Sequence, residues 1–363
     1  MRILYFFACE ESAMFQWQNI HIVEEMKHYE CEIQIINPLK YETLDKANEE
    51  VLKTLMSSTY DLFMSCHHGG VLYSDTVQAI NHMGIPTLNF RPDNLVIPYY
   101  DKSSAKNYDL VWLTSKETEY LYKRWGCKTI FLPYAANPYA FTPENVRNEI
   151  ERVCFIGNPH GSRIDTLNHL LEGNIPVSVH TLQQQTSHKV LSAPLNSYKK
   201  VLVENNLRYP IGLKLTMGAV KEKLGRRKLR TDSPFISIEN PVALSELSKA
   251  YSTYGLSLSF TDANSTGVLK NPVKIVNLRN FEIPMAGGLQ ITMYSPEIKQ
   301  YFEDGKEIVL AKSKDELVEK SRFYLRPDNY GVRRKMKDAA RRRAENEHTW
   351  GHRFEKIFRE LGI

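Results

Sequence analysis

Short apolar runs alternate with amphipathic segments through residues 1–132, and this alternation restricts the fold more than any other feature of the sequence. Residues 3–7 and 110–113 are typical of buried strands, whereas residues 44–57 repeat apolar side chains at helical spacing. Alternating strands and helices with short connections predict a doubly wound parallel α/β sheet. Further strands are expected at 32–36, 61–66, 85–90 and 129–132, and further helices at 17–28, 74–83 and 116–125.

A second α/β pattern follows a polar linker at residues 137–151. A chain of 363 residues has room for two domains of ordinary size. The sequence therefore predicts two α/β domains, residues 1–140 and residues 151–345, with a less regular stretch at 181–234. In the second pattern we expect strands at 152–157, 177–180, 256–260, 289–293 and 307–310, and helices at 164–172, 217–229, 242–253, 294–302, 317–324 and 353–361.

The net charge of +5 is mild, and basic residues cluster in two runs, residues 221–230 and 333–343. Each run is interpreted as a solvated helix face, with attraction to anionic lipid or to a diphosphate as the functional alternative. Aromatic residues are sparse within the runs, and no nucleic-acid-binding module is recognisable, so no nucleic-acid partner is expected.

The five cysteines are widely spread and include no Cys-x-x-Cys pair, which favours free thiols in a reducing compartment and gives no metal framework. The apolar start at residues 3–8 is short for a signal sequence and reads better as a first strand. No run reaches the roughly 20 apolar residues of a membrane-spanning helix. We therefore expect a cytoplasmic protein. The alternative is a cytoplasmic protein that contacts the inner face of the membrane through the basic runs.

The segment at residues 277–288 carries the charged pair Arg279 and Glu282 within a stretch otherwise suited to close packing. Pro284 can start a helical turn, and Gly287 and Gly288 can end it and let backbone approach another group closely. An ionised carboxylate only accepts hydrogen bonds, so Glu282 suits the adjacent hydroxyls of a ribose. The structural alternative is that Glu282 caps a helix and pairs with Arg279.

The loop at residues 157–163 follows a buried strand and precedes a helix, so backbone N–H groups at Gly157 and Asn158 could meet an anion. Arg163 could add a planar fork to a diphosphate. The loop matches neither Gly-x-Gly-x-x-Gly nor a Walker loop, and an ordinary turn also uses Gly and Asn. Further candidate cations are Lys214, Lys270, Lys274 and Arg279, and a further candidate ligand loop is 264–267.

In the first domain, His67 and His68 close a strand and are followed by two glycines. Because histidine accepts a proton near neutral pH, either could contact an acceptor or act as a base. Glu10, after the first strand, is a further candidate base. The alternatives are a structural histidine pair, a metal pair without an evident third ligand, and an exposed acidic loop. Arg91 and Asp93 end another strand at the same rim.

From residue 256 onward the chain resembles GT-B glycosyltransferases, and most of all the group of spore-maturation CgeB-like proteins. The resemblance is carried by residues 277–282, 286–288, 302–307 and 348–353. In the wider family a glutamate five positions before a glycine contacts the ribose, and Glu282 and Gly287 have that spacing. Many retaining members carry a second glutamate eight positions earlier, where this chain has Lys274.

The resemblance implies two Rossmann-like domains facing each other across a cleft, with a C-terminal helix at 353–363 crossing back to the first domain. It implies a metal-independent glycosyltransferase without a cofactor, whose donor is a nucleoside diphosphate sugar and whose acceptor is a glycan, a lipid-linked molecule or a protein. The second domain would hold the donor and the first the acceptor hydroxyl. A base is needed if the anomeric centre inverts, whereas in a retaining reaction the diphosphate can take the proton.

Two other classes of protein compete with this interpretation, an inactive binding protein of the same fold and a nucleic-acid-binding protein that would use the basic runs. A nucleotide- or sugar-binding protein of the same fold that lost turnover would share every feature above. A dinucleotide oxidoreductase is disfavoured, because no Gly-x-Gly-x-x-Gly with a later acidic residue occurs.

Overall fold

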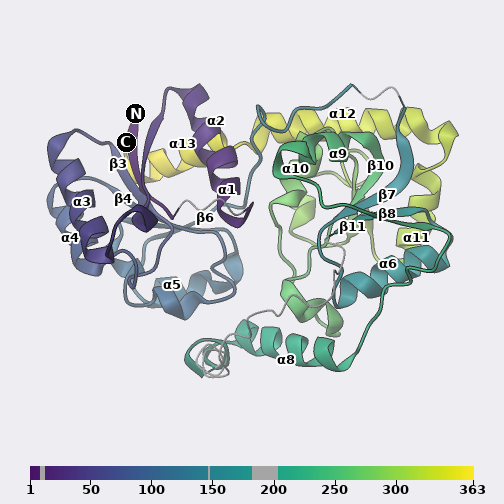
Figure 1. Ribbon diagram of the computed structural model, residues 1–363, viewed down its shortest axis with the longest axis horizontal. Helices are drawn as coiled ribbons and strands as arrows, with labels where there is room; N and C mark the ends of the chain where they lie inside the picture. Colours follow the sequence, from purple (N-terminus) through teal and green to yellow (C-terminus); the bar gives the residue numbers. More distant parts are fainter. Residues whose placement is uncertain (9–12, 146–147, 182–202) are drawn as a thin grey trace. The chain divides into compact units, whose positions relative to one another are not determined.

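The computed structural model describes residues 1–8, 13–145, 148–181 and 203–363, which fall into two compact units (Figure 1). The first unit comprises Met1–Ala135, Val203–Gly212 and Trp350–Ile363. The second comprises Ala136–Leu202 and Leu213–Thr349. The chain therefore passes between the units four times.

The first unit contains a parallel sheet of six strands in the order β2-β1-β3-β4-β5-β6. Its central strands are buried along their whole length, as expected for a sheet covered on both faces. The strand order reverses at β1, which pairs with both β2 and β3. The strands are β1 Arg2–Phe6, β2 Glu32–Ile36, β3 Leu62–Ser65, β4 Thr87–Arg91, β5 Leu110–Leu113 and β6 Thr129–Phe131.

Helices pack on this sheet from separate parts of the chain. α3 and α4 pack together, and the C-terminal α13 contacts α2. Trp350 of α13 is fully buried among the rings of Trp17, Phe90 and Trp112, so the last helix belongs to the core of the first unit. The helices are α1 Ala13–Gln18, α2 Glu24–Met26, α3 Leu44–Ser57, α4 Ser74–His82, α5 Glu119–Arg124 and α13 Trp350–Leu361.

The second unit also contains a parallel sheet of six strands, in the order β12-β11-β10-β7-β8-β9. The strand order reverses between β7 and β10, which is the strand order 3-2-1-4-5-6 of a dinucleotide-binding sheet. The strands are β7 Ile150–Ile156, β8 Val177–His180, β9 Ile236–Glu239, β10 Tyr254–Leu258, β11 Gln290–Met293 and β12 Val309–Ala311.

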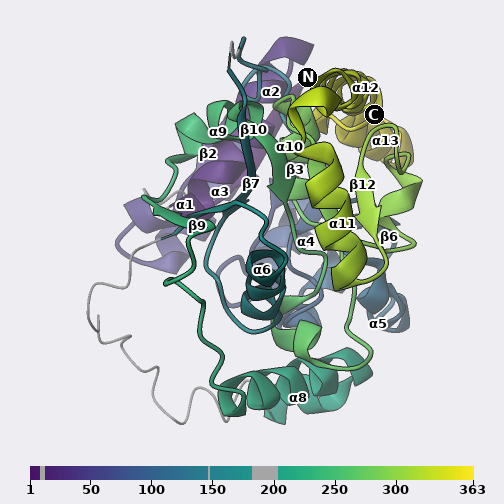
Figure 2. The ribbon, with the colours of Figure 1, turned by 90° about the vertical axis from the view of Figure 1, so that its right-hand side faces the viewer.

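Helices cover both faces of this sheet (Figure 2). α6 packs with α11, whereas α10 packs with α9 and α12. Ser313 Oγ accepts a 3.1 Å hydrogen bond from the backbone N–H of Glu316 and so begins α11. The helices are α6 Ser162–Glu172, α9 Leu247–Thr253, α10 Arg279–Met285, α11 Lys314–Tyr324 and α12 Tyr330–Glu347. Helix α8, Pro210–Leu224, begins in the first unit and continues in the second from Leu213.

The predicted doubly wound architecture is confirmed in both units, but several local predictions were wrong. Residues 294–302 were expected to form a helix and contain only a 3-10 turn, Ile298–Gln300. The helix expected at 217–229 lies earlier, as α8. Pro284 does not begin its helix, because α10 starts at Arg279 and carries the proline inside it. The helix expected at 17–28 is interrupted by a π-helical turn, Asn19–Val23.

The basic run at 333–343 lies on α12, but it is not simply a solvated face. Arg333 is fully buried and Lys337 is 4% exposed. Both bind the carboxylate of Glu149, with Arg333 Nε 2.6 Å from Glu149 Oε2. Part of this run therefore holds α12 against the sheet, because an ion pair satisfies the buried charges.

Residues 203–212 also depart from expectation, because they lie in the first unit and not in the predicted second domain at 151–345. Asn205 is fully buried, and its amide oxygen and nitrogen bind the Tyr99 N–H and the Val96 carbonyl at 3.1 and 2.9 Å. The Tyr209 hydroxyl donates to Leu95 and Val96 carbonyls.

The cysteines within the described ranges are free thiols, and Cys31, Cys127 and Cys154 are buried. None of the helices in those ranges is both long and apolar enough to cross a bilayer.

Candidate functional site

The candidate site of the second unit lies where its strand order reverses. Loops that follow β7 and β10 meet at the carboxyl edge of the sheet, and this edge is where open α/β sheets bind their ligands. The loop after β7 contains Gly157 and Asn158, α6 carries Arg163 in its first turn, and α10 begins with Arg279. The structure therefore brings together residues that are 116 or more positions apart in the sequence.

Gly157 lies beside the guanidinium group of Arg279. Its φ is +147°, a conformation that disfavours side chains, and a Cβ built there would lie 3.9 Å from Arg279 Nη2. The Gly157 N–H donates to the carbonyl of His180 on β8, so it is not available to a ligand. A Cβ at that distance would make only ordinary van der Waals contact, so the backbone conformation, and not a lack of space, favours glycine here.

Arg163 brings a second positive charge to the same edge. Its Nη1 donates to the Asn158 carbonyl at 3.3 Å, and its guanidinium carbon lies 5.6 Å from the centre of the Phe260 ring. Burial lowers the pKa of Arg163, and the neighbouring charge of Arg279 lowers it further. Two arginines that repel each other favour binding of an anion between or beside them.

Glu282 lies one helical turn after Arg279 on α10 and is 3% exposed. The buried hydroxyl of Tyr251 and the carboxylate of Glu282 raise the pKa of Arg279, and Tyr251 contributes the larger part. Burial raises the pKa of Tyr251, whereas Arg279 lowers it. Arg279, Glu282 and Tyr251 thus form one electrostatic group, which is compatible with both the pairing and the ribose interpretations of Glu282.

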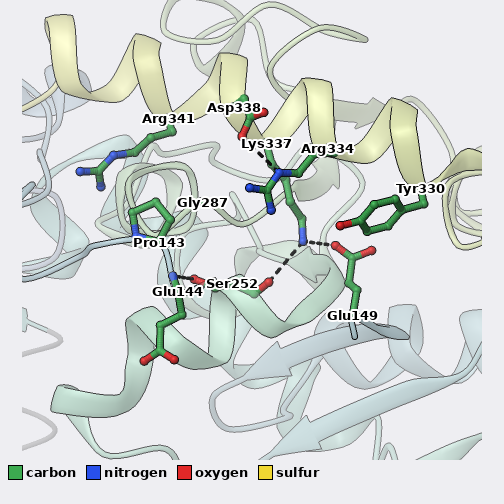
Figure 3. Close-up of a pocket in the computed structure, with 10 residues that line it drawn as sticks. All are labelled: Pro143, Glu144, Glu149, Ser252, Gly287, Tyr330, Arg334, Lys337, Asp338 and Arg341. Atoms are coloured by element: carbon green, nitrogen blue, oxygen red, sulfur yellow. Dashed lines mark hydrogen bonds and ion pairs between the residues drawn. The ribbon is translucent and has the colours of Figure 1, made fainter. Parts of the chain in front are cut away.

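Gly287 and Gly288 follow α10 at its other end, and Figure 3 shows Gly287 beside Pro143. Gly287 has φ of +71°, and a Cβ there would lie 2.8 Å from Pro143 Cβ. A Cβ at Gly288 would lie 2.9 Å from the Tyr251 carbonyl oxygen. Close packing of α10 against its neighbours therefore accounts for both glycines.

Figure 3 also shows Gly287 and Pro143 at a cavity of about 50 Å³, into which α12 directs Lys337, Arg334 and Arg341. Pockets for small ligands usually measure hundreds of cubic ångströms. Lys337 is already bound to Glu149 and to backbone carbonyls of Ser252 and Tyr254. This cavity is too small for a nucleotide, and its central cation is engaged within the protein.

Three residues that sequence analysis did not single out interact electrostatically with Arg163 or Arg279. Asp262 binds Lys274 Nζ, and both Asp262 and Glu222 raise the pKa of Arg163 against the dominant effect of burial. The third is Tyr251. A signal for Asp262 was present, because it follows β10 by four residues, whereas Glu222 and Tyr251 lie on helices and carry no such signal.

The other candidate cations lie apart from this arrangement or are engaged. Lys274 takes part in the ion pair with Asp262. Lys214 lies on the exposed part of α8, and Lys270 is exposed after Asn264–Val268, a 3-10 turn that contains the candidate loop 264–267. Of the cations weighed from the sequence, Arg279 is the one whose charge lowers the pKa of Arg163.

In the first unit, His67 lies at the end of β3, where the strand order reverses. Its Nε2 accepts a 3.0 Å hydrogen bond from the Ala8 N–H at the end of β1. Burial lowers the pKa of His67 to about 4, and the charges of Arg91 and His68 contribute to this shift. His67 is therefore neutral near pH 7, and its Nε2 is occupied by a backbone donor.

His68 is half-buried, and its Nδ1 accepts from the Gly70 N–H at 3.0 Å. Its ring centre lies 6.1 Å from that of Tyr100. Tyr99 and Tyr100, with Glu204 and Arg208, line a cavity of about 190 Å³. His68 therefore borders the wall of a cavity with aromatic and charged lining, although sequence analysis identified only the histidine.

The remaining candidates of the first unit have different surroundings. Arg91 is buried, binds Asp101 at 2.6 Å and donates to the Cys66 carbonyl at 2.7 Å. Asp93 is exposed and lies 3.4 Å from the Tyr134 hydroxyl. Glu10 lies outside the described residues. Within the described ranges, no three His, Cys, Asp or Glu side chains are placed to hold a metal ion.

A family model described as glycosyl transferase-like matches residues 223–359. No curated protein matches the sequence. Among solved structures, sucrose-phosphate synthase from Thermosynechococcus elongatus is 12% identical, with a TM-score of 0.57 over 99% of both chains. Anabaena Alr3699/HepE in complex with UDP-glucose is 11% identical, with a TM-score of 0.56 over 100% of this chain and 99% of that chain.

A glycosyltransferase from Rickettsia africae ESF-5 is 12% identical, with a TM-score of 0.55 over 99% of this chain and 98% of that chain. The chain has the GT-B fold. Both six-stranded units belong to it, as the matches cover nearly the whole length. In this GT-B chain, Gly157, Arg163, Arg279 and Glu282 lie together, whereas Gly287 and Gly288 pack at the far end of α10.

Proposed function

We propose that this GT-B protein is a glycosyltransferase that moves a sugar from a nucleoside diphosphate sugar to a hydroxyl acceptor. The observation that carries the proposal is the pair Arg163 and Arg279 beside Gly157, where the sheet of the second unit reverses its order. A similar fold, that of HepE, is known in complex with UDP-glucose. The resemblance of residues 277–288 to the CgeB-like group supports the same assignment.

Each residue of the second unit has a role in this proposal. Glu282 accepts hydrogen bonds from the ribose, and Arg163 and Arg279 bind the diphosphate. As the bond from the sugar carbon to the diphosphate breaks, negative charge grows on the leaving oxygen. Fixed cations stabilise that charge in the transition state more than in the ground state, which is how a metal acts elsewhere. Transfer is therefore proposed to proceed without a metal or a cofactor.

The first unit is proposed to bind the acceptor, a glycan, a lipid-linked molecule or a protein. Tyr99, Tyr100, Glu204 and Arg208 suit a hydroxyl-bearing ligand, because aromatic faces pack against sugar rings and charged groups bind hydroxyls. A base is required if the anomeric centre inverts, and the engaged Nε2 of His67 is poorly suited to it. We favour transfer of the acceptor proton to the departing diphosphate, with His67 and His68 as positioning residues.

Isothermal titration with UDP, GDP, CDP and dTDP, each with EDTA present, tests the donor site. We expect one nucleotide to bind, and Arg163→Gln to weaken it by about tenfold, the loss of one charge-assisted contact. Arg342→Gln, an exposed arginine of α12, is the control and should bind as the wild type does. Equal affinities in all three proteins, or no binding, would reject the donor site.

A second variant separates ribose from diphosphate recognition. Glu282→Gln keeps the size of the side chain but weakens its acceptor strength, so affinity for the nucleoside diphosphate should fall. Affinity for inorganic pyrophosphate, which has no ribose, should not fall. Parallel losses for both ligands would assign Glu282 to the pairing role with Arg279 alone.

An inactive binding protein of the same fold is the second candidate. Two observations favour it: Lys274 occupies the position of the second glutamate and pairs with Asp262, and His67 Nε2 is occupied. Release of nucleoside diphosphate from a bound donor, measured with a mixture of glycan and lipid-linked acceptors, separates the two candidates. Turnover supports the transferase, and binding without turnover supports the inactive protein.

A further inference from the structure

Helix α8 carries exposed apolar side chains on the face opposite its contacts with the second unit. Its inner face is fixed by contacts with the second unit. Leu215 is 7% exposed, and a Cβ at Gly218 would lie 2.6 Å from the Ser265 carbonyl oxygen. Glu222 binds His160 Nδ1 at 3.0 Å, in the loop that contains Gly157. These contacts fix the rotation of the helix about its axis.

On the opposite face, Leu213, Met217, Val220 and Leu224 are 44%, 62%, 56% and 77% exposed. Their spacing of four, three and four residues places them within about 60° of one another around a helix of 3.6 residues per turn. We call these four residues the α8 stripe. Figures 1 and 2 both show α8 along the outer edge of its unit, beyond α6.

Lysines flank the α8 stripe on both sides. Lys214 and Lys221 lie about 80–100° to one side of Leu213, and Lys223 lies about 80° to the other. Arg226 and Lys228 follow the helix, and all five are exposed. No ion pair joins any of these five to another described residue, whereas Glu222, the one acidic residue of α8, faces inward.

We propose that the α8 stripe binds the surface of a bilayer that contains anionic phospholipid. Apolar side chains on one face of a helix insert at the boundary between headgroups and acyl chains, and lysines at its flanks reach the phosphates. Each basic residue near an anionic leaflet adds to the attraction. The inference is independent of the donor and acceptor assignments.

The charges argue for lipid over other occupants of the α8 stripe. In a two-fold contact between two copies, the stripe would meet itself and bring lysines close to lysines. A nucleic acid would neutralise the lysines but leave the apolar side chains in water. An anionic bilayer satisfies both the apolar stripe and its cationic flanks.

Vesicle flotation with the full chain tests the proposal. We expect binding to phosphatidylcholine mixed with phosphatidylglycerol, little binding to phosphatidylcholine alone, and a decrease with salt. Met217→Glu, in the stripe, should lower binding at least about tenfold, because it places a charge at the apolar boundary. Ala219→Glu adds the same charge about 200° around the helix and should have a much smaller effect.

The flanking charges need their own matched pair of variants. Replacing Lys214, Lys221 and Lys223 together by glutamine should lower binding at least about tenfold. The control replaces by glutamine three exposed lysines elsewhere on the second unit, Lys249, Lys299 and Lys312. This control should bind the vesicles as the wild type does. Circular dichroism establishes that each variant is folded.

Three results would overturn the proposal. The first is equal binding to the two kinds of vesicle. The second is binding of Met217→Glu that matches Ala219→Glu. The third is a wild-type dimer in analytical ultracentrifugation that Met217→Glu converts to a monomer, which would assign the α8 stripe to a second copy of the chain.

Discussion

Arg163 and Arg279 are the two side chains on which the proposed donor site mainly depends. Burial lowers the pKa of Arg163 and the charge of Arg279 lowers it further, whereas Tyr251 and Glu282 raise the pKa of Arg279. The fold nevertheless holds the two arginines together beside Gly157. In the proposed donor site, a doubly charged diphosphate would offset the charge of Arg279 on Arg163, and this would favour donor binding.

Gly287 illustrates a residue whose importance is structural. Gly287→Ala should lower the free energy of unfolding by about 1–3 kcal/mol, because an alanine is strained at this φ and its Cβ would meet Pro143. Nucleotide affinity of the folded variant should not change. Urea denaturation and titration calorimetry provide the two measurements.

Gly331 of α12 is the matched control for Gly287. A Cβ added at Gly331 would meet only open space, and the residue lies at the start of a helix, so Gly331→Ala should stabilise the protein slightly. If Gly287→Ala binds the nucleotide more weakly than the wild type and Gly331→Ala does not, Gly287 contributes to the ligand site.

His67 gives a pH dependence of stability with a definite sign. Its pKa falls from about 6.5 in the unfolded chain to about 4 in the folded protein, so folding favours the neutral ring. The contribution is complete above pH 6.5 and is lost as the pH falls toward 4, up to about 3 kcal/mol. Urea denaturation at pH 7 and pH 4.5 measures it.

His67→Asn keeps an acceptor for the Ala8 N–H but does not titrate in this range. Both proteins should lose stability between pH 7 and pH 4.5, because carboxylates such as Asp101 titrate in both. The variant should lose less than the wild type, because it lacks the contribution of His67. The same loss in the two proteins would show that His67 does not titrate as its surroundings imply.

At the scale of elements, α12 is held to the sheet of the second unit by a buried ionic group. Glu149 precedes β7 and binds both Arg333 and Lys337, whose side chains are 0% and 5% exposed. Removing one partner of a buried ion pair leaves an uncompensated charge, which is far more costly than losing an exposed pair.

Glu149→Gln should therefore destabilise the protein by about 3–5 kcal/mol. Asp338→Asn is the control, because Asp338 is exposed on the same helix and its pair with Arg334 is worth less than about 1 kcal/mol. Thermal unfolding compares the two. A loss in Glu149→Gln no larger than in Asp338→Asn would mean that α12 is held by its apolar contacts alone.

At the scale of the whole molecule, the segment Val203–Gly212 returns to the first unit between β8 and β9 of the second. Asn205→Ala removes the partners of the Tyr99 N–H and the Val96 carbonyl, which should cost about 1–3 kcal/mol locally. We expect faster trypsin cleavage after Arg208, while the melting temperature changes little. Asn206→Ala, at a half-buried neighbour, is the comparison. Unchanged cleavage would show that Asn205 does not hold the segment.

Much of both sheets could be predicted from the sequence, because buried parallel strands are apolar runs that short polar segments separate. The bounds of β2, α3, β5 and β8 match the expected ranges. β9 was missed because it lies at the edge of the sheet and its four residues are only half-buried. Apolar and polar residues alternate along it, so it forms no apolar run.

The candidate site was predicted only as separate segments. Gly157, Arg163, Arg279 and Glu282 were each identified from local pattern or from the family resemblance. That they meet depends on the pairing of β7 with β10, which lie about 100 residues apart in the sequence. Likewise, the segment 294–302 has helical spacing and buries Ile298 and Phe302, but the structure forms only a 3-10 turn there.

The sequence alone determined the succession of strands and helices, because local burial and turn chemistry leave a record at each position. Only the tertiary structure decided which side chains share an environment. It paired Arg163 with Arg279, buried Arg333 and Lys337 within a basic run, and turned the α8 stripe outward. The physical reason is that charge coupling and burial depend on distances in space, which contacts between remote segments fix.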